Sequence, residues 1–514
     1  MKIKLSLRFL QKTVAPVMIA ILILSRSAHA QTGTPVPQLA HMDVAVTNFM
    51  QQWNLPGGSL AIVKDGRLVY ARGFGLANRE TNELVQPHHL FRIASVSKPI
   101  TAAAVMKLLE EGKIHLADKV FGSQGILNDP AYAAINDVRV LDVTVQHLLQ
   151  HTADWNLYVS GDPMFKALEI AQAMQVPPPP APEKIIQYML ARQLNFTTGT
   201  QFQYSNFGFL ILGRVIERLS GMSYEEFVKT AILQPAGAAG FKLGKNLLEN
   251  RDENEVKYYD FPGAPFERSV YGTGALVPRT YGGFNIEAMD AHGGWIASAT
   301  DLLRFLVAID GFNTKPDILG QSSINAMTKT TTPHMNFYAL GWEADPGRNN
   351  WWHNGALAGA SALIYRRNDG VAWAILFNSW PQHQNFSTSL ATMIFTAINA
   401  VRSWPAHDLF DAQTSVEETP IVNSFRLLQN YPNPFNPTTN IAYTIPRAAT
   451  VKLVVYNATG QIVRTLVHQQ QREGAYVITW DGKNEAGAAL ASGVYEYRLQ
   501  AGEFQQSGKM ILLR

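Results

Sequence analysis

A long apolar run directly after a Ser-x-x-Lys-Pro motif limits the folds open to this chain. Residues 100–109 are apolar on nearly every side of a helix, which is typical of a helix buried at the centre of a large domain. Pro99 is tolerated only in the first turn of a helix, so this helix begins close to Ser95. The sequence therefore predicts a central buried helix with Ser95 at its N-terminus.

Ser95 and Lys98 lie three residues apart and share one face of this helix. A lysine that is shielded from water can accept the proton of a serine hydroxyl and make that oxygen a nucleophile. Free backbone N–H groups at the helix N-terminus favour the negative charge that forms during acyl transfer. The alternative is an ordinary helix start, in which Ser95 or Ser97 caps the helix and Lys98 is solvated.

Composition excludes several classes of protein. A length of 514 residues allows roughly two to four domains, and a hydrophobic content of 46% with 16% charged residues is typical of a folded globular protein. The net charge of +3 is small, and no basic stripe is interleaved with aromatic residues, so nucleic acid is not an expected partner. The chain has no cysteine, which excludes disulfides, thiolate catalysis and cysteine-ligated zinc.

Residues 1–30 are typical of an export signal. Residues 14–24 are apolar, and Ala28-His29-Ala30 fits the small-x-small pattern of a cleavage site. Basic residues precede the apolar run: Lys2, Lys4, Arg8 and Lys12. An uncleaved anchor is the alternative, but spanning a bilayer needs about 20 apolar residues. We expect cleavage after Ala30 and a mature chain that is secreted or held at the cell surface.

Two predicted hairpins lie far apart in the sequence, each with an Asp-Gly turn. They cover residues 59–63 with 68–73, and residues 360–365 with 371–377. An amphipathic helix precedes the first hairpin, and an apolar helix over 387–401 follows the second. We expect one antiparallel sheet within a domain of residues 31–404, assembled from distant parts of the chain around a helical insert at 95–305.

The residue pattern changes in the last part of the chain, from residue 405 onward. Residues 405–424 are acidic and polar without an apolar period, which is typical of a linker. Residues 425–514 contain short predicted strands separated by turn sequences, at 439–445, 451–456, 461–466, 475–480, 493–499 and 509–513. This pattern predicts a small all-β, immunoglobulin-like sandwich.

Serine activation by lysine needs a second group that handles protons. Tyr204-Ser205-Asn206, directly before an apolar helix, is the candidate. A tyrosine held near the lysine can pass a proton to the leaving group, and Asn206 can bind a substrate amide. The alternative is that Ser205 caps the helix and Tyr204 is a hydrophobic neighbour.

A second donor to the oxyanion is also required. His353-Asn354-Gly355 comes just before a predicted strand, and an edge strand there can offer a backbone N–H and pair with an extended substrate. We prefer this site to His292-Gly293-Gly294, which is expected to serve close backbone packing beside the pocket. A plain turn at Asn354-Gly355 is the alternative.

Three motifs in one order resemble the serine β-lactamase-like family over about residues 38–400: Ser95-x-x-Lys98, Tyr204-x-Asn206 and His353-x-Gly355. This family includes class C β-lactamases, serine D-Ala-D-Ala carboxypeptidases, D-aminopeptidases and related esterases. The resemblance implies an α/β fold of the β-lactamase/transpeptidase type, with an antiparallel sheet flanked by helices and a helical subdomain.

The resemblance also implies a role for each residue. Ser95 would form the acyl-enzyme, Lys98 and Tyr204 would share the proton transfers, and Asn206 would orient the substrate. The N–H groups of Ser95 and Ala356 would hold the oxyanion. No cofactor is implied.

The predicted function is a secreted serine hydrolase that acts through an acyl-serine on an amide or ester, such as a D-amino-acid peptide or a small acyl ester. Class C β-lactamases carry a lysine where this chain has His353, and a neutral imidazole anchors a substrate carboxylate less well. A true β-lactamase and a non-catalytic binding protein that retains the fold are the alternatives.

A metal site is a competing hypothesis. His147 and His151 have the i, i+4 spacing of zinc ligands on a helix. However, Leu148 stands where a His-Glu-x-x-His motif has its glutamate, and no clear third ligand follows. We therefore expect no metal.

Residues 425–514 resemble a type IX secretion C-terminal sorting domain. The resemblance rests on residues 428–439 (LQNYPNPFNPTT), on Trp480-Asp481-Gly482 and on the basic-apolar end at 509–513. It implies that the signal peptide takes the chain across the inner membrane and that outer-membrane secretion machinery then recognises the sandwich. An adhesive or carbohydrate-binding module is the alternative.

Overall fold

The computed structural model describes residues 31–153, 155–330, 337–410, 425–430, 433–471 and 474–513. The chain divides into two compact units, Met1–Phe410 and Asp411–Arg514. The predicted signal peptide lies outside the described residues. Among the described residues, no helix combines the length and the apolar character that crossing a membrane requires.

Part of the predicted linker belongs to the first unit. Residues 405–410 are described, and the Leu68 N–H donates to Asp408 Oδ1 at 3.0 Å. Arg304 Nη2 donates to the carbonyl oxygen of Phe410 at 2.8 Å. These contacts fasten the chain to the first unit as far as Phe410, and residues 411–424 lie outside the described part of the chain.

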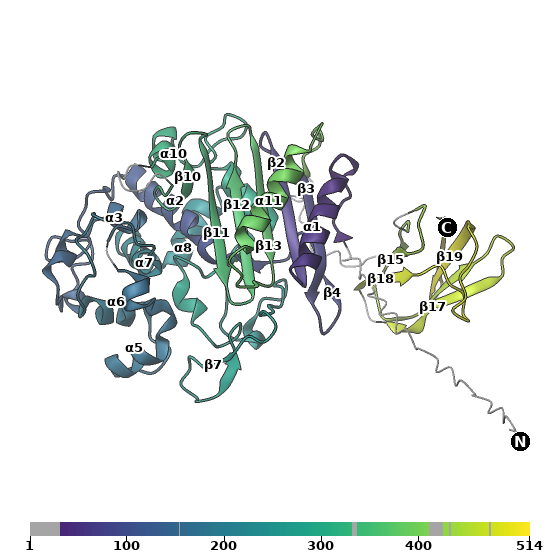
Figure 1. Ribbon diagram of the computed structural model, residues 1–514, viewed down its shortest axis with the longest axis horizontal. Helices are drawn as coiled ribbons and strands as arrows, with labels where there is room; N and C mark the ends of the chain where they lie inside the picture. The colour runs from purple at the N-terminus through teal and green to yellow at the C-terminus, as the bar shows by residue number, and fades with distance from the viewer. Residues whose placement is uncertain are drawn as a thin grey trace, which may run out of the picture. The chain divides into compact units, whose positions relative to one another are not determined.

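The first unit is built on one antiparallel sheet with the strand order β1-β3-β2-β13-β12-β11-β10 and with β4 paired to β3 (Figure 1). The strands are β1 (Gln31–Thr32), β2 (Gly57–Lys64), β3 (Arg67–Asn78), β4 (Glu83–Leu84), β10 (Glu343–Asp345), β11 (Asn350–Leu357), β12 (Ala360–Arg366) and β13 (Val371–Phe377). Both predicted hairpins are confirmed, as β2–β3 and β12–β13. Strand β13 pairs with β2, with Ala374 opposite Ala61, so the sheet joins the two ends of the unit as predicted.

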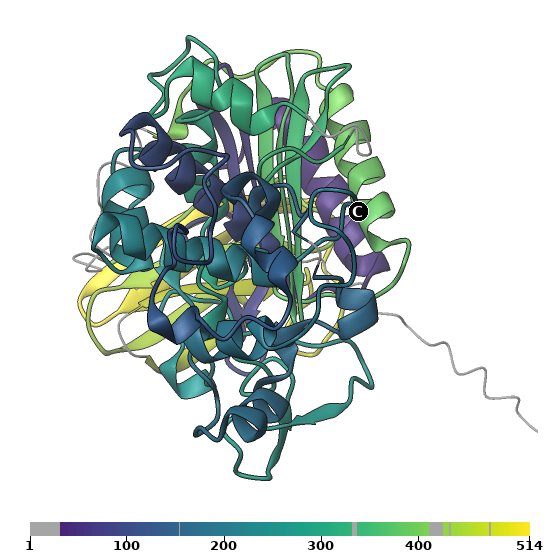
Figure 2. The same ribbon diagram turned by 90° about the vertical axis from the view of Figure 1, so that its left-hand side faces the viewer.

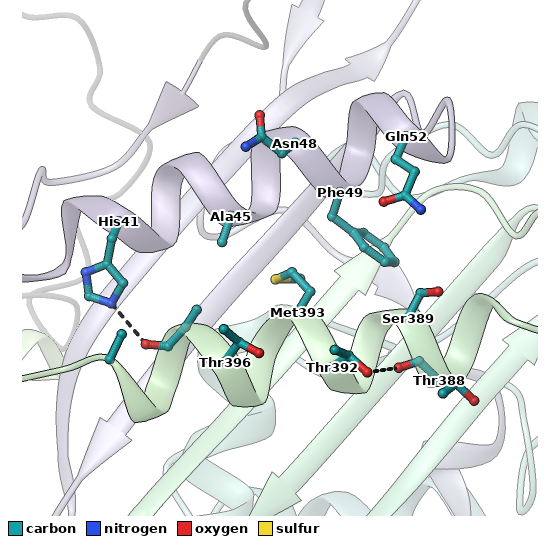
Figure 3. A pocket seen from close by; sticks show the side chains of 12 residues that line it. His41, Ala45, Asn48, Phe49, Gln52, Thr388, Ser389, Thr392, Met393 and Thr396 are labelled. Carbon is teal, nitrogen blue, oxygen red and sulfur yellow. Dashed lines mark hydrogen bonds between the residues drawn. The ribbon is translucent and has the colours of Figure 1, made fainter.

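Two helices cover one face of this sheet, α1 (Ala40–Gln52) and α11 (Phe386–Asn399) (Figure 1). The Phe49 ring lies 5.5 Å from the Phe386 ring and links them. A groove of about 600 Å³ runs between the helices, where His41 donates to the Ala397 carbonyl at 3.0 Å (Figure 3). The described residues that line this groove include none of the predicted site residues.

The opposite face carries α2 (Ser97–Glu110), the predicted central helix. Its side chains are buried nearly all round, including Ile100, Ala103 and Met106. The predicted helical insert is present, and its helices, drawn in blue and teal, lie in front of the sheet in Figure 2. The helices from α3 to α10 are α3 (Val145–Leu149), α4 (Leu157–Ser160), α5 (Ala167–Met174), α6 (Pro182–Leu190), α7 (Asn206–Ser220), α8 (Tyr224–Val228), α9 (Ala299–Val307) and α10 (Gln321–Thr328).

Two small sheets complete the first unit. Strand β9 (Trp295–Ala297) pairs with β5 (Phe91–Arg92) and with β6 (Lys242–Leu243), and this pairing fixes the chain just before α2. Strands β7 (Phe266–Arg268) and β8 (Leu276–Pro278) form a separate hairpin.

The second unit is the predicted sandwich of two antiparallel sheets, with strand orders β14-β15-β18 and β17-β16-β19-β20. The strands are β14 (Arg426–Leu427), β15 (Thr439–Ile445), β16 (Ala449–Tyr456), β17 (Ile462–Gln471), β18 (Gly474–Trp480), β19 (Gly493–Ala501) and β20 (Phe504–Leu512). Trp480, Tyr497 and Leu453 are buried between the sheets. Alternating apolar residues along β15 and β19 give each strand one buried face, which is why the sequence predicted them.

Candidate active site

Ser95 lies at a sharp turn between β5 and α2. The turn is a 3₁₀ segment, Ala94–Val96, and the α-helix proper begins at Ser97. Ala94 has φ +48°, a left-handed conformation that costs energy for a residue with a Cβ. The turn leaves Ser95 partly exposed at the wall of a pocket.

Lys98 is buried directly beside Ser95. Its Nζ lies 3.1 Å from Ser95 Oγ and donates to Asn206 Oδ1 at 2.7 Å and to the His292 carbonyl at 3.2 Å. The residue is 0% exposed, so the alternative of a solvated lysine is wrong. Burial lowers the pKa of Lys98 to about 7, although the charge of Asp162 opposes the shift. An amine of this pKa can be neutral near pH 7 and can accept the Ser95 proton.

Tyr204 and Asn206 reach the same pair of residues from the start of α7. Tyr204 lines the same pocket as Ser95, and Lys98 Nζ lies 4.6 Å from the centre of the Tyr204 ring. Burial raises the pKa of Tyr204, so the phenol keeps its proton at neutral pH. Ser205 does cap α7, because its Oγ accepts from the Gly208 N–H at 3.2 Å. This cap aims its two neighbours at the Ser95–Lys98 pair.

Asp162 is a member of this cluster that sequence reasoning missed. Asn206 Nδ2 donates to Asp162 Oδ2 at 2.6 Å, which turns the Asn206 amide oxygen toward Lys98. Asp162 Oδ1 also accepts from the Met164 N–H at 3.0 Å and caps a 3₁₀ turn. The only local signal is the Asp-Pro pair at 162–163, which indicates a cap and carries no sign of the contact with Asn206.

Replacing Asp162 with asparagine is expected to lower the pKa of Lys98, because the carboxylate is the neighbour that favours the ammonium form. The acid limb of kcat/KM against pH should therefore move to lower pH. Hydrolysis of a p-nitrophenyl ester over a pH series measures this limb. Asp129→Asn is the matched control, because Asp129 caps another 3₁₀ turn in the same way. A limb that moves equally in both variants, or in neither, contradicts this electrostatic role.

Behind the site, a chain of buried hydrogen bonds connects His151, Tyr338 and His353. His151 Nδ1 accepts from the Ser205 N–H at 3.1 Å, so Nε2 carries the hydrogen and donates to the Tyr338 hydroxyl at 3.1 Å. That hydroxyl lies 3.1 Å from His353 Nε2 and donates to it, while His353 Nδ1 donates to the Asn354 carbonyl at 2.7 Å. Burial lowers the pKa of His353 to about 3, so its imidazole is neutral.

These contacts also account for the histidine pair considered as zinc ligands. Helix α3 ends at Leu149 and His151 has φ +57°, so His147 and His151 do not share a helix. His147 Nδ1 accepts from the Thr144 N–H at 3.2 Å. Among the described residues, no cluster of three or more His, Cys, Asp or Glu side chains could hold a metal ion.

Gly355 allows strand β11 to pass close to the turn that carries Ser95. A Cβ at this position would lie 2.2 Å from the Ile93 carbonyl oxygen and 3.3 Å from the Ala94 Cβ. Asn354 and Gly355 lie in β11 and pair with Leu363 and Ala362 of β12, so the alternative of a plain turn is wrong. Ala356 follows at the strand edge, and together with Ser95 it lines a pocket of about 280 Å³.

Gly355→Ala is therefore expected to push β11 away from Ser95 and to separate the two N–H groups assigned to the oxyanion. Loss of one oxyanion donor costs on the order of 100-fold in rate, and we expect a drop of at least this size in acylation. Gly208→Ala is the control, because the nearest atom to its Cβ outside its own helix would be the Leu148 carbonyl oxygen, at 3.6 Å. Equal acylation rates for Gly355→Ala and the wild type would contradict the close passage of β11.

The second His-x-Gly sequence serves packing. A Cβ on Gly294 would lie 2.9 Å from the Ile286 carbonyl oxygen, which agrees with the expected close backbone approach. The His292 carbonyl accepts the hydrogen bond from Lys98, so this segment also helps to position the lysine.

A family model described as Beta-lactamase matches residues 42–393. The chain belongs to the Beta-lactamase family. This member of the Beta-lactamase family is 22% identical over 346 residues to Protein flp of Staphylococcus aureus (strain MRSA252). The alignment covers 66% of this chain and 63% of flp. It is 28% identical over 292 residues to Esterase EstB of Burkholderia gladioli, covering 52% of this chain and 69% of EstB. The chain thus spans less than two thirds of the length of flp.

Solved structures with the same fold include D-amino acid amidase from Ochrobactrum anthropi SV3 complexed with L-phenylalanine, at a TM-score of 0.54 and 19% identity, covering 70% of this chain and 100% of the amidase. D-alanine carboxypeptidase AmpC from Burkholderia cenocepacia has a TM-score of 0.52 at 19% identity, and the match covers 70% of this chain and 99% of the carboxypeptidase. A FlgD Ig-like domain model matches residues 435–503. Membership of the Beta-lactamase family, with its esterase relative, supports a serine hydrolase in general.

Proposed function

We propose that this chain is a serine hydrolase that forms an acyl-enzyme on Ser95 and acts on an amide or an ester. The observation that carries the proposal is the state of Lys98, which is wholly buried, lies 3.1 Å from Ser95 Oγ and has a pKa lowered to about 7. Burying an ammonium group costs free energy, and groups with strongly shifted pKa values cluster at functional sites.

The reaction follows from the positions of these groups. Ser95 Oγ attacks the substrate carbonyl carbon while its proton passes to the neutral amine of Lys98. The N–H groups of Ser95 and Ala356 stabilise the oxyanion of the tetrahedral intermediate. When the bond to the leaving group breaks, Tyr204 hands a proton to the departing nitrogen or oxygen and recovers one from Lys98. Water, deprotonated by the same pair, then releases the acyl group from Ser95.

The charge of the pocket favours substrates that need no carboxylate anchor. Among the described residues, its walls hold one carboxylate, Glu343, and neither lysine nor arginine. His353, which stands where class C enzymes have lysine, is neutral because burial lowers its pKa to about 3. Simple esters and amides therefore suit the site better than penicillins, whose carboxylate would lack a charged partner.

The test is the mass of the intact mature protein after brief exposure to p-nitrophenyl butyrate and, separately, to benzylpenicillin. We expect turnover of the ester through a transient butyryl adduct on Ser95, and slow or no reaction with the penicillin. Rapid hydrolysis of benzylpenicillin would favour a true β-lactamase. Absence of turnover and of any adduct with both compounds would favour the non-catalytic protein.

We also propose that residues 425–514 are a type IX sorting domain and that the chain is exported. The resemblance of residues 428–439 to such domains supports this, as do the immunoglobulin-like sandwich and the FlgD Ig-like match. The start of the motif is held on the sandwich by Tyr497, whose hydroxyl accepts from the Asn430 N–H at 2.9 Å and donates to the Leu428 carbonyl at 2.8 Å.

Deleting residues 425–514 is expected to leave active enzyme in the periplasm, because the signal peptide remains while the outer-membrane signal is lost. Cell fractionation followed by an ester assay measures where the enzyme accumulates. Retained activity in the periplasmic fraction is the control for folding of the first unit. Secretion of the truncated chain at the normal level would contradict the sorting role.

A further inference from the structure

A second hollow of about 410 Å³ adjoins the catalytic pocket. The two share Ala356 and Trp380, so they meet at the residue that offers the oxyanion N–H. From there the second hollow continues along Leu357 and Ala358, past the end of strand β11. A volume of this size is in the range of small-molecule sites.

The direction of the reaction decides which part of a substrate lies there. The leaving group needs a proton from Tyr204 or Lys98, and Tyr204 lines the catalytic pocket together with His353 and Glu343. His353 lies at one side of Ala356 along β11, and Leu357 lies at the other. With the reacting carbonyl at Ala356, a leaving group on the Tyr204 side places the acyl group on the Leu357 side, in the second hollow.

The walls of this hollow are aromatic. Phe165 and Phe284 meet edge to face with ring centroids 6.0 Å apart, and Trp380 stands at the junction with the catalytic pocket. Phe165 is 53% exposed, so much of its ring is accessible to a ligand in the hollow. An apolar acyl group lying against Phe165 would shield that ring from water.

The one cation among the described residues of this wall is already neutralised. Arg279 donates from Nε and Nη2 to the two carboxylate oxygens of Asp260, both at 2.7 Å. The Gln382 amide oxygen, turned toward the guanidinium, accepts a further hydrogen bond at 2.8 Å from Nη2. Glu267 adds a negative charge at the wall. A carboxylate on the acyl group would therefore meet a guanidinium whose charge is already paired.

We propose that this hollow is the acyl-group site of the enzyme and that it selects an uncharged, aromatic or similarly bulky apolar acyl group. The inference rests on the proposed acyl-enzyme function. It names the substrate class as esters or amides of arylalkanoic or comparable apolar acids, and it assigns Phe165, Phe284 and Trp380 as the residues that determine this preference.

The experiment compares kcat/KM for p-nitrophenyl acetate, p-nitrophenyl phenylacetate and mono-p-nitrophenyl succinate with the wild-type chain. One well-filled apolar subsite is worth about 10-fold or more in kcat/KM, so we expect the phenylacetate to exceed the acetate by at least this factor. The succinate carries a carboxylate, so its kcat/KM should be the lowest of the three, although its acyl group is larger than that of the acetate.

Phe165→Ala should reduce the phenylacetate-to-acetate ratio by about 3-fold to 10-fold, and Phe284→Leu gives a second, milder test of the same wall. The matched control is Phe266→Ala, because Phe266 is also exposed, at 62%, and does not line the hollow. The control should keep the wild-type ratio.

The outcomes separate the acyl-site inference from the hydrolase proposal. Turnover of the esters with a ratio near one, with a preference for the succinate, or with a ratio unchanged in Phe165→Ala and Phe284→Leu overturns the acyl-site inference and leaves the hydrolase proposal standing. Failure of every ester to acylate Ser95 overturns the hydrolase proposal itself.

Discussion

Ser95→Ala is expected to abolish acylation and to lower kcat/KM for ester hydrolysis by about 10³-fold or more. Removing a nucleophile that works together with its base usually costs at least this much, while binding and the oxyanion donors leave a small residual rate. The methyl group of the substituted alanine has no oxygen to attack the carbonyl, so no acyl adduct can form there. Intact mass after exposure to p-nitrophenyl butyrate and steady-state kinetics measure the two effects.

Ser97→Ala is the control for this experiment, because Ser97 lies two residues along the chain and points elsewhere. Its Oγ accepts from the Trp295 N–H at 3.4 Å and takes no part in the contacts of Lys98 Nζ. We expect Ser97→Ala to keep its acyl adduct. An adduct that persists in Ser95→Ala and disappears in Ser97→Ala would make Ser97 the nucleophile and would contradict the mechanism.

Lys98→Arg is expected to lower the acylation rate by on the order of 10³-fold, although it conserves positive charge. A guanidinium does not lose its proton in proteins, so it cannot accept the proton of Ser95. In the wild type, kcat/KM should rise with pH through about 7, as Lys98 gives up its proton. The pH profile of ester hydrolysis measures this limb, and single-turnover acylation measures the loss in the variant.

Lys107→Arg is the matched control, because Lys107 is the other lysine of α2 and is partly exposed. It should keep both the rate and the pH limb of the wild type. A Lys98→Arg variant that retains the wild-type rate, or a wild-type profile that is flat between about pH 6 and 8, would contradict a role for Lys98 as the base.

The elements that the sequence predicted best are those with a strong local signal. Residues 100–109 are apolar on nearly every side, and a buried helix accommodates such a run. The hairpins β2–β3 and β12–β13 have apolar strands and Asp-Gly turns, so each could be placed without knowledge of the other. We could also predict that the two hairpins join in one sheet, because a hairpin on its own is marginally stable and needs a further strand.

The parts that escaped prediction depend on contacts between distant residues. Asp162 meets Asn206 across 44 positions, and Tyr338 meets His151 across 187. A single aspartate or tyrosine in a loop carries no periodic signal, so such pairs emerge only when the fold is known. The assumption that His147 and His151 share a helix was wrong for a related reason, because their spacing alone did not reveal that α3 ends at Leu149.

The case of Gly355 lies between these extremes. The motif was predicted to come just before a strand at 360–365, but it lies inside β11, a strand that the sequence analysis did not predict. The reason for glycine at this position is steric and involves the carbonyl oxygen of Ile93, which is distant in the sequence. The second hollow beside Ala356 is likewise formed by residues from distant parts of the chain, namely strands β7 and β11, a 3₁₀ turn and several loops.

The burial of Lys98 also determines how the folded state responds to pH. In the unfolded chain this lysine would have its ordinary pKa of 10.5, against about 7 in the fold, so unfolding between these two pH values takes up a proton. The free energy of unfolding therefore gains from this group as pH rises through that window, and the full cost of desolvating the lysine is present below about pH 7. The first unit thus retains a reactive amine at the expense of its own thermodynamic stability, and this loss of stability becomes smaller in alkaline solution.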